Sequence, residues 1–319
     1  MAEKKSNAAE LRARLEIARL KFALADLSEN SRNGYGFDWR AFVRWCKALE
    51  LESFPATADT VGLHLTDMLC RGLKVSSIRR RAAGIAHVHA SRDAPSPVTN
   101  EIQRLMRGAR RTRIDDKRQV RPLSIEELRQ ISVLLEGDGR PIAYRDRAIM
   151  VAGFASALRS ASLSLLQLSD VEWSEQGITL RVRKEKQDQE GKGRLIGLPH
   201  GKHPETCPVR CLKNWIDRRG SRPGPLFVRF DNGWAARYAP LSPERFSAIL
   251  KLCVKRIGLD AKQFGSHSLR SGFITAAGME QIGDWIIASQ SGHASMTCLK
   301  EYFRRRDVFK SNACALLDL

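Results

Sequence analysis

The feature that most constrains this chain is an ordered set of polar side chains in its last quarter. His267 and Arg270 lie in the segment HSLR, His293 ends the segment SGH, and Tyr302 follows nine residues later in EYF. The apolar residues between them predict short consecutive helices. Because His267 and Arg270 are three residues apart, we expect both to project from one helix face toward one anion. We expect Ser266 to cap this helix.

These side chains suit an attack on a phosphodiester without a metal ion. Such a reaction needs a nucleophile, cations for the phosphoryl oxygens, an acceptor for the nucleophile's proton and a proton donor for the leaving oxygen. Tyr302 offers a nucleophile, and Arg270 offers a bidentate fork for phosphate. His267 can take a proton or hold an oxygen, since the ordinary pKa of histidine is near physiological pH.

The order H-x-x-R, then G-H, then a tyrosine resembles the tyrosine recombinases, most of all the compact Cre-like phage and plasmid recombinases. That family also has an upstream arginine in a helix that ends in an apolar, aspartate-containing turn, and FASALRSASLSLLQLSDVEW offers Arg159 in that place. Family members frequently carry an acidic residue three positions after this arginine, where this chain has Ser162. The departure removes an expected partner of the active-site arginines or of His267.

The resemblance also implies a catalytic lysine on a β-turn after this arginine, with Lys184, Lys186 and Lys192 as candidates. Alternating apolar and polar residues over 178–182 predict a half-buried strand, and residues 195–198 predict a second strand. Register against the family favours Lys186, where the first strand gives way to the turn. Alternation alone places Lys184 and Lys186 on one face, and three surface lysines without a catalytic role are the alternative.

Composition points independently to a nucleic acid as partner. The chain has 54 Lys and Arg against 35 Asp and Glu, a formal net charge of +19 and a pI of about 10.1. Such an excess suits a protein that lies along a phosphate backbone. Ribosomal proteins, repressors and topoisomerases share it, so charge alone does not indicate recombination.

Length and apolar content allow one large or two medium domains with buried cores: 319 residues, of which 43% are hydrophobic. We expect a soluble, cytoplasmic protein without a membrane partner, because the sequence has neither an apolar membrane span nor the apolar core of a signal peptide. The seven scattered cysteines indicate reduced thiols.

One cluster resembles a zinc site, since His200, His203, Cys207 and Cys211 fall within twelve residues. The better interpretation is structural. Pro208 is typical of the first residue of a helix, whose apolar face would include Cys211. We therefore expect no metal and no cofactor.

The charged segment RGARRTRIDDKRQVRP has no apolar periodicity and predicts an interdomain linker. Ser124 and Glu127 then form a capping box that starts a second domain. The predicted divisions are an N-terminal helical extension (1–27), a helical core-binding DNA-binding domain (28–106), a basic linker (107–122) and a catalytic domain with a C-terminal docking tail (123–319).

The helical domain contains SENSRNGYGFDWRAFVRWC and RGLKVSSIRRR, which look like the core-binding domain of Cre-like recombinases. We expect a helix beginning at Lys74, capped by Ser76 or Ser77, with its arginines displayed near the start, although a solvated helix face is the commoner role of such a run. The resemblance implies DNA contact by Arg32, Lys74, Ser76, Ser77, Arg79 and Arg80.

As a whole, the resemblance implies a mostly α fold with a small β-sheet, in which a helical core-binding domain precedes an α+β catalytic domain. It implies a site-specific DNA recombinase in which Tyr302 forms a 3′-phosphotyrosine and a homotetramer on inverted-repeat DNA passes through a Holliday junction. Arg159, Arg270 and His293 would hold the non-bridging oxygens, His267 would assist deprotonation, and Lys186 would protonate the 5′ oxygen.

Two other functions remain open from the sequence. A type IB topoisomerase-like enzyme shares the tyrosine chemistry but relaxes DNA without exchanging partners. A DNA-binding protein that has lost catalysis on the same fold is the second, and Ser162 is the residue that keeps it in consideration. The full set of six catalytic positions argues against the inactive protein, because DNA binding alone does not require them.

Overall fold

The computed structural model describes residues 28–113, 120–183, 185, 193–231 and 235–293. The chain divides into two compact units, Met1–Arg118 and Gln119–Leu319, here called the helical unit and the C-terminal unit. The predicted N-terminal extension, residues 1–27, and most of the predicted C-terminal docking tail lie outside the described residues. In the described part of the chain, no helix is long and apolar enough to span a membrane.

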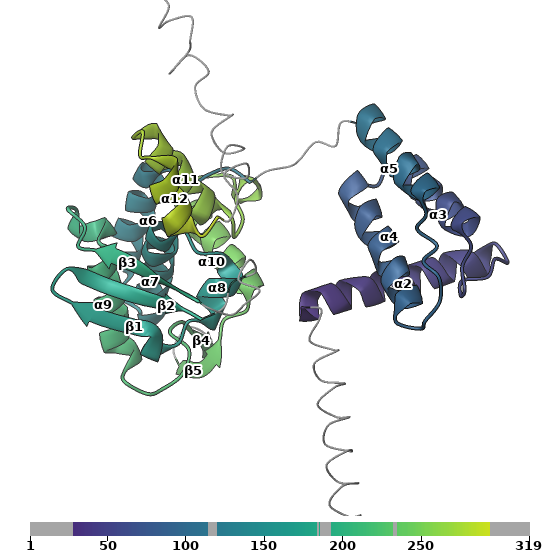
Figure 1. The fold of residues 1–319 in the computed structure, drawn as a ribbon. Helices are drawn as coiled ribbons and strands as arrows, with labels where there is room; N and C mark the ends of the chain where they lie inside the picture. Colours follow the sequence, from purple (N-terminus) through teal and green to yellow (C-terminus); the bar gives the residue numbers. More distant parts are fainter. Residues whose placement is uncertain (1–27, 114–119, 184, 186–192, 232–234, 294–319) are drawn as a thin grey trace, which may run out of the picture. The chain divides into compact units, whose positions relative to one another are not determined.

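Helices build the described part of the helical unit (Figure 1). Ser28 caps the first of them, because its hydroxyl accepts a hydrogen bond from the Ser31 amide at 3.2 Å. Apolar side chains from successive helices meet in one core, in which Phe42, Leu65 and Ile85 are fully buried. The described helices are α2 (Glu29–Ala48), α3 (Ala58–Cys70), α4 (Val75–Ala90) and α5 (Asn100–Thr112).

Two boundaries in this unit differ from the prediction. Helix α5 continues through residues 107–112, which we expected to be linker, because Met106 and Ala109 pack into the core and keep the chain helical. Helix α4 begins at Val75 with Lys74 as its N-cap residue, so neither Ser76 nor Ser77 caps it. Burial of Val75 draws the helix start toward the core, ahead of both serines.

The C-terminal unit is assembled around helix α7 (Pro141–Ser156). Almost every residue of its second half is buried, because α6 (Ile125–Asp138), α9 (Pro208–Arg219), α11 (Ser268–Met279) and strand β3 (Arg194–Pro199) all pack against it. The capping box predicted at the start of α6 is confirmed. The Glu127 carboxylate accepts a hydrogen bond from the Ser124 amide at 2.9 Å, which fixes where the helix begins.

A three-stranded antiparallel sheet has the order β1–β2–β3, with β1 at Val171–Ser174 and β2 at Gly177–Val182 (Figure 1). Its central strand confirms the predicted alternation, since Ile178, Leu180 and Val182 are buried. The pairing of β2 with β3 brings Arg194 opposite Val182, where the connection containing the candidate lysines begins and ends. The β2–β3 pair thus sets the position of that connection.

A second sheet was not predicted. It pairs β4 (Val228–Asp231) with β5 (Ala235–Pro240), and its sequence, rich in arginine and alanine, lacks the alternation of a half-buried strand. Helix α10 (Pro243–Arg256) follows it. The fold is therefore mostly α with small antiparallel sheets, as the sequence predicts, with two sheets in place of one.

Candidate active site

Arg159 lies in the short connection between α7 and α8 (Ser160–Leu165). Helix α7 ends because Ala157 adopts a left-handed conformation with a φ of 52°. Ala157 and Leu158 are buried and anchor this connection, and Arg159 then serves as the N-cap residue of α8 with an extended backbone. The prediction that Arg159 lies inside a helix is therefore wrong, and the arginine instead extends from a buried turn between two helices.

The guanidinium of Arg159 is available to an anion. Within the described part of the chain, its buried Nη1 has no hydrogen-bond acceptor. A carboxylate oxygen of Glu185 lies 4.0 Å from that nitrogen, which is beyond hydrogen-bond length. A buried cationic donor without an acceptor costs free energy, and a bound oxyanion would remove that cost.

Helix α11 begins one residue later than predicted. His267 is its N-cap residue, in place of Ser266. The amide of Gly265 donates a hydrogen bond to the Ser268 hydroxyl at 3.1 Å, so a turn leads into the helix and delays its start. Because of this turn, His267 precedes the first turn of the helix, and the residue is exposed.

Arg270 joins the ends of two other helices. Its side chain is fully buried. Nη1 donates to the carbonyl oxygen of Ala157 at 2.8 Å and also to that of Ser291, the last residue of α12 (Asp284–Ser291). Both carbonyl oxygens accept from Nη1, and they carry no net charge of their own. The end of α7, the first turn of α11 and the end of α12 therefore meet at one cation.

His293 follows directly after α12. Gly292 ends that helix in a left-handed conformation with a φ of 66°, which favours glycine. Nη2 of Arg270 lies 3.0 Å from Nε2 of His293. The Ser291 hydroxyl donates to the carbonyl oxygen of Ile287 at 2.5 Å, so it accepts from Nδ1 of His293 at 2.7 Å. These contacts fix the ring and assign the proton of the neutral imidazole to Nδ1.

Both active-site histidines are shifted toward their neutral form. Burial, followed by the charges of Arg270 and Arg159, lowers the pKa of His293 to about 4. The same causes in the same order lower the pKa of His267. A neutral imidazole at position 267 can accept a proton. The charges of Arg159 and Arg270 thus act on both rings.

The structure includes a buried carboxylate that we did not single out from the sequence. Glu185 lies just after β2, and its side chain is only 7% exposed. Its negative charge lies close to Arg159. Its Oε2 accepts a hydrogen bond from Nε of Arg194 at 2.6 Å. The strand alternation ends at Val182, so no periodic signal marks residue 185 as buried. Lys184, Lys186, Lys192 and Tyr302 lie outside the described residues, and their roles stay predictions.

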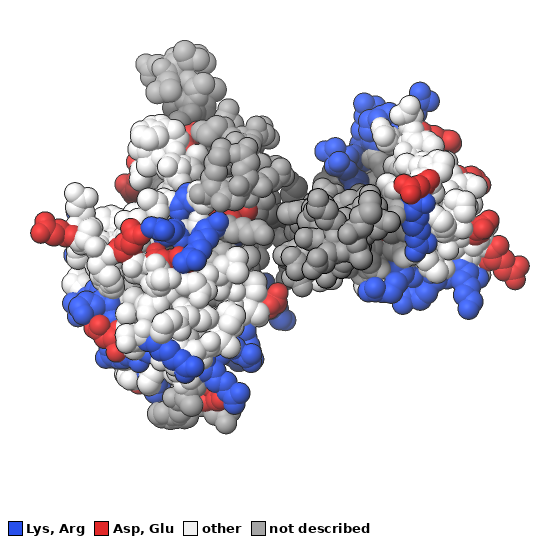
Figure 2. All heavy atoms as spheres, turned by 60° about the horizontal axis from the view of Figure 1, so that its bottom comes forward, with Lys and Arg blue, Asp and Glu red and all other residues white. Residues whose placement is uncertain are grey.

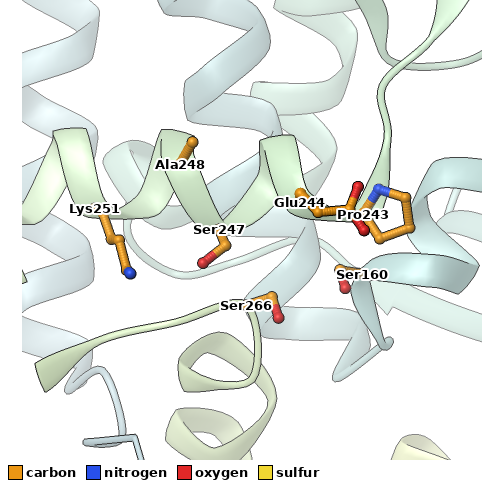
Figure 3. Close-up of a pocket in the computed structure, with 7 residues that line it drawn as sticks. All are labelled: Ser160, Pro243, Glu244, Ser247, Ala248, Lys251 and Ser266. Carbon is orange, nitrogen blue, oxygen red and sulfur yellow. The ribbon is translucent and has the colours of Figure 1, made fainter. Parts of the chain in front are cut away.

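A polar cleft of about 400 Å³ adjoins the cluster. Figure 3 shows that it lies between α10, the start of α8 and the segment that leads to α11. Ser160 and Ser266, the neighbours of Arg159 and His267 in sequence, line it together with Ser247 and Lys251. The lining thus combines three hydroxyls and an ammonium group with the carboxylate of Glu244.

The predicted DNA-contact residues lie on the helical unit, where most are exposed. Arg32, Lys74, Ser76 and Arg79 are open to solvent, and Ser77 is partly buried. Arg80 is exposed too, but its guanidinium binds the Asp38 carboxylate through hydrogen bonds of 2.8 and 3.2 Å. In Figure 2, Lys and Arg side chains follow the upper and lower edges of this unit, while Asp and Glu side chains lie on its right-hand side.

The two cysteines of the zinc-like cluster pack into the protein. Cys207 and Cys211 are buried at the start of α9, where Pro208 is the first helical residue, as predicted. Burial raises the pKa of Cys211 to about 11, so that side chain remains a thiol at neutral pH. In the described part of the chain, no three His, Cys, Asp or Glu side chains are grouped to hold a metal ion.

Comparison with known proteins gives consistent results. A family model described as "Phage integrase family" matches residues 122–308. A protein of Selenomonas ruminantium, an integrase/recombinase described as a xerD homolog, is 30% identical over 291 residues, which cover 90% of this chain and 84% of that protein.

Two solved structures share the fold at low sequence identity. The Tn1549 transposon integrase in complex with transposon right end DNA has a TM-score of 0.64 at 15% identity, covering 95% of this chain and 97% of that one. A lambda integrase dimer bound to a COC′ core site has a TM-score of 0.60 at 19% identity, covering 91% and 95%. The more specific likeness to Cre-like recombinases stays a prediction. Since the family match spans more than half of the sequence and a relative aligns over nearly all of it, the chain belongs to the phage integrase family and is a tyrosine recombinase.

Proposed function

We propose that this recombinase cuts and rejoins DNA strands at a specific site through a 3′-phosphotyrosine intermediate. The oxygen of Tyr302 attacks the scissile phosphorus, a new O–P bond forms, and the bond to the 5′ oxygen breaks. The observation that carries the proposal is the meeting of three segments at the buried Arg270. Its guanidinium donates to the carbonyl oxygen of Ala157, two residues before Arg159, and lies 3.0 Å from His293.

The two arginines act mainly on the charge of the transition state. Negative charge grows on the non-bridging oxygens as the phosphorus gains a fifth substituent, and cations fixed beforehand stabilise that charge without reorganising. The free Nη1 of Arg159 and the rigid attachment of Arg270 support this role. His293 lies against Arg270 and completes the clamp, with a pKa that a bound phosphate would raise from about 4.

Proton transfers accompany the two bond changes. The neutral ring of His267 takes the proton of the Tyr302 hydroxyl, and Lys186 gives a proton to the departing 5′ oxygen. The lowered pKa of His267 supports the first transfer. Each cut exchanges one phosphoester bond for another, so the bond energy is conserved for rejoining. The reaction therefore needs neither ATP nor a metal ion.

DNA is the substrate and the scaffold of the assembly. We infer a double-stranded site with inverted repeats, four copies of the chain on two such sites, and a Holliday junction between the two rounds of exchange. The DNA complexes of the Tn1549 and lambda integrases, which share the fold, support a DNA substrate. The net charge of +19 adds sequence-independent attraction to the phosphates. We place the activity in the cytoplasm, on prokaryotic, phage or plasmid DNA.

The test is a denaturing assay for covalent protein–DNA adducts. The purified chain is incubated, with a chelator present, with a fragment library from the DNA that flanks its gene, and the trapped fragments are sequenced. We expect adducts from the wild type and none from Tyr302→Phe, which should still bind the same fragments. Adducts from Tyr302→Phe would exclude Tyr302 as the nucleophile, and no adduct from the wild type on bound fragments would contradict catalysis.

A plasmid assay with the recovered fragment then distinguishes strand exchange from relaxation of supercoils. Two copies of the site on one plasmid should yield products with exchanged flanks in the order that the site orientation dictates. Relaxation of supercoils without exchanged flanks would instead assign the chain to topoisomerase-like chemistry.

A further inference from the structure

Glu185 brings a negative charge to the edge of the arginine cluster. Its Oε1 lies 4.0 Å from Nη1 of Arg159 and 3.5 Å from the hydroxyl of Ser162. Ser162 is itself buried, on α8. Among the described residues, Glu185 is the carboxylate that forms an ion pair with Arg159. Two segments far apart in sequence, α8 and the end of β2, thus meet at this side chain.

The same carboxylate is locked to the end of α12. Arg194 donates to Oε2 of Glu185 at 2.6 Å and, through Nη1, to the carbonyl oxygens of Ser289 and Gln290 at 3.0 Å each. The pair fills the space beside Gly292, where a Cβ would come within 2.8 Å of Glu185 Oε2 and 2.9 Å of Arg194 Nε. The residue before His293 must therefore be small for the ion pair to form.

Glu185 lies next to Ser162, the residue at which this chain departs from the family pattern. The resemblance to the tyrosine recombinases implies an acidic residue three positions after Arg159, where this chain has Ser162. We propose that Glu185 supplies the carboxylate that position 162 lacks and positions Arg159 for the scissile phosphate. The inference rests on the proposed function. It makes Glu185 a positioning residue that acts through Arg159 and does not itself touch DNA.

Electrostatics indicate why such a carboxylate is needed. Arg159, Arg270 and Arg194 all act on His293 as positive charges. Without a counter-charge these guanidinium groups would repel one another before DNA arrives, and the partly exposed Arg159 could turn toward solvent. At 4.0 Å, Glu185 attracts Arg159 without occupying its Nη1 donor, which stays available for a phosphoryl oxygen.

The experiment exchanges the two side chains. Glu185→Ser, Glu185→Gln and the double variant Glu185→Ser with Ser162→Glu are compared with the wild type on the DNA fragment recovered in the adduct assay. Single-turnover cleavage rates are measured, with melting temperature and DNA affinity as checks. Glu172→Gln is the matched control, since Glu172 is a carboxylate on β1 of the same sheet whose partner, Arg181, is exposed.

We expect Glu185→Ser and Glu185→Gln to slow cleavage on the order of tenfold to a hundredfold, as loss of a residue that orients a catalytic group does. The exchanged double variant should regain at least half of this loss on a logarithmic scale, because it returns a carboxylate to the same cavity from α8. Glu172→Gln should cleave like the wild type. Glu185→Gln keeps the shape of the side chain, which guards against a result caused by misfolding.

A substrate with a 5′-thiol leaving group shows through which residue Glu185 acts. Lys186→Ala should recover on this substrate, because a better leaving group needs less acid catalysis. Glu185→Ser should not recover if it acts through Arg159. Recovery of Glu185→Ser would instead assign its effect to the adjacent lysine and overturn the proposal.

Three further outcomes are decisive. Wild-type cleavage rates in both Glu185 variants would overturn the inference while the proposed function stands. Failure of the exchanged double variant to gain cleavage, with its melting temperature and DNA affinity intact, would do the same. Absence of adducts from the wild type would remove the proposed function and this inference with it.

Discussion

Each unit holds an arginine against a histidine, and the two pairs differ in how the charge is balanced. In the helical unit, Nη1 of Arg81 lies 3.3 Å from Nε2 of His64, and its Nε donates to the Asp38 carboxylate at 3.0 Å. In the C-terminal unit, Arg270 lies against His293 but donates to backbone carbonyl oxygens. Asp38 gives the first arginine a carboxylate partner, whereas the carbonyl oxygens that accept from the second carry no net charge.

The difference separates a structural pair from a pair that can bind an anion. A buried ion pair that is satisfied internally gains nothing from a phosphate, because its charge is already matched. A buried cation held by carbonyl dipoles keeps an attractive field for an oxyanion. Burial of an arginine therefore does not identify an active site by itself. The identity of its acceptors does.

The largest expected effect on the cleavage rate comes from a substitution of Arg270. Arg270→Lys keeps a positive charge but loses the planar fork that reaches two carbonyl oxygens and the histidine together. We expect single-turnover cleavage to fall on the order of a hundredfold to a thousandfold, as for loss of one transition-state donor. Arg81→Lys is the matched control and should leave the cleavage rate of bound DNA unchanged. Equal losses in the two variants would contradict the distinction.

A second change removes the counter-charge of the structural pair. Asp38→Asn leaves Arg81 buried and Arg80 without its carboxylate partner. Breaking a buried ion pair by removing one partner costs about 3 kcal/mol or more. We therefore expect the free energy of unfolding of the helical unit to fall by that amount in urea titrations, with little change in cleavage once DNA is bound. Unchanged stability would show that Asp38 does not balance these arginines.

The lowered pKa values of His64 and His293 lead us to expect a third, smaller effect, a loss of stability over a defined pH range. Burial is the main cause that lowers the pKa of both His64 and His293 to about 4. Between about pH 6.5 and pH 4 the unfolded chain binds more protons than the folded chain, so stability is present above about pH 6.5 and is lost as the pH falls toward 4.

After allowance for solvent screening, each histidine should contribute on the order of 1 kcal/mol to this loss. Urea titrations at pH 7.5 and pH 4.5 measure it. His64→Gln and His293→Gln should each reduce the pH dependence, because glutamine does not titrate in this range. The same pH dependence in both variants and the wild type would exclude these rings as its source.

The sequence indicated which C-terminal polar side chains gather better than it indicated the groups that hold them. The spacing of His267, Arg270 and His293 identified side chains that the structure brings together, because the motif reflects the chemistry of the anion site. The carbonyl acceptors of Arg270 could not be read in the same way. They belong to Ala157 and Ser291, and their positions depend on how three helices pack.

Errors arose where local pattern and tertiary packing disagree. A helix counted from Glu280 to Gln290 places Ile282, Trp285 and Ile286 on one apolar stripe suited to packing, yet all three are exposed. Helix α12 begins only at Asp284 and buries Ile287, so a stripe counted from residue 280 has the wrong phase. Glu185 was missed because the strand alternation stops before it, and only the folded chain brings it to Ser162.

The smallest effect tests the comparison on the arginines of the helical unit that we predicted to contact DNA. Arg79 is exposed, whereas the guanidinium of Arg80 donates to the Asp38 carboxylate, which it shares with Arg81. An arginine that neutralises one phosphate contributes about 0.9 to the slope of log affinity against log salt concentration. We expect Arg79→Ala to reduce that slope by about this amount on a random-sequence duplex and Arg80→Ala to reduce it less. Equal reductions would mean that Asp38 releases Arg80 when DNA binds, and the balanced charges of the helical unit would then be a property of the free protein.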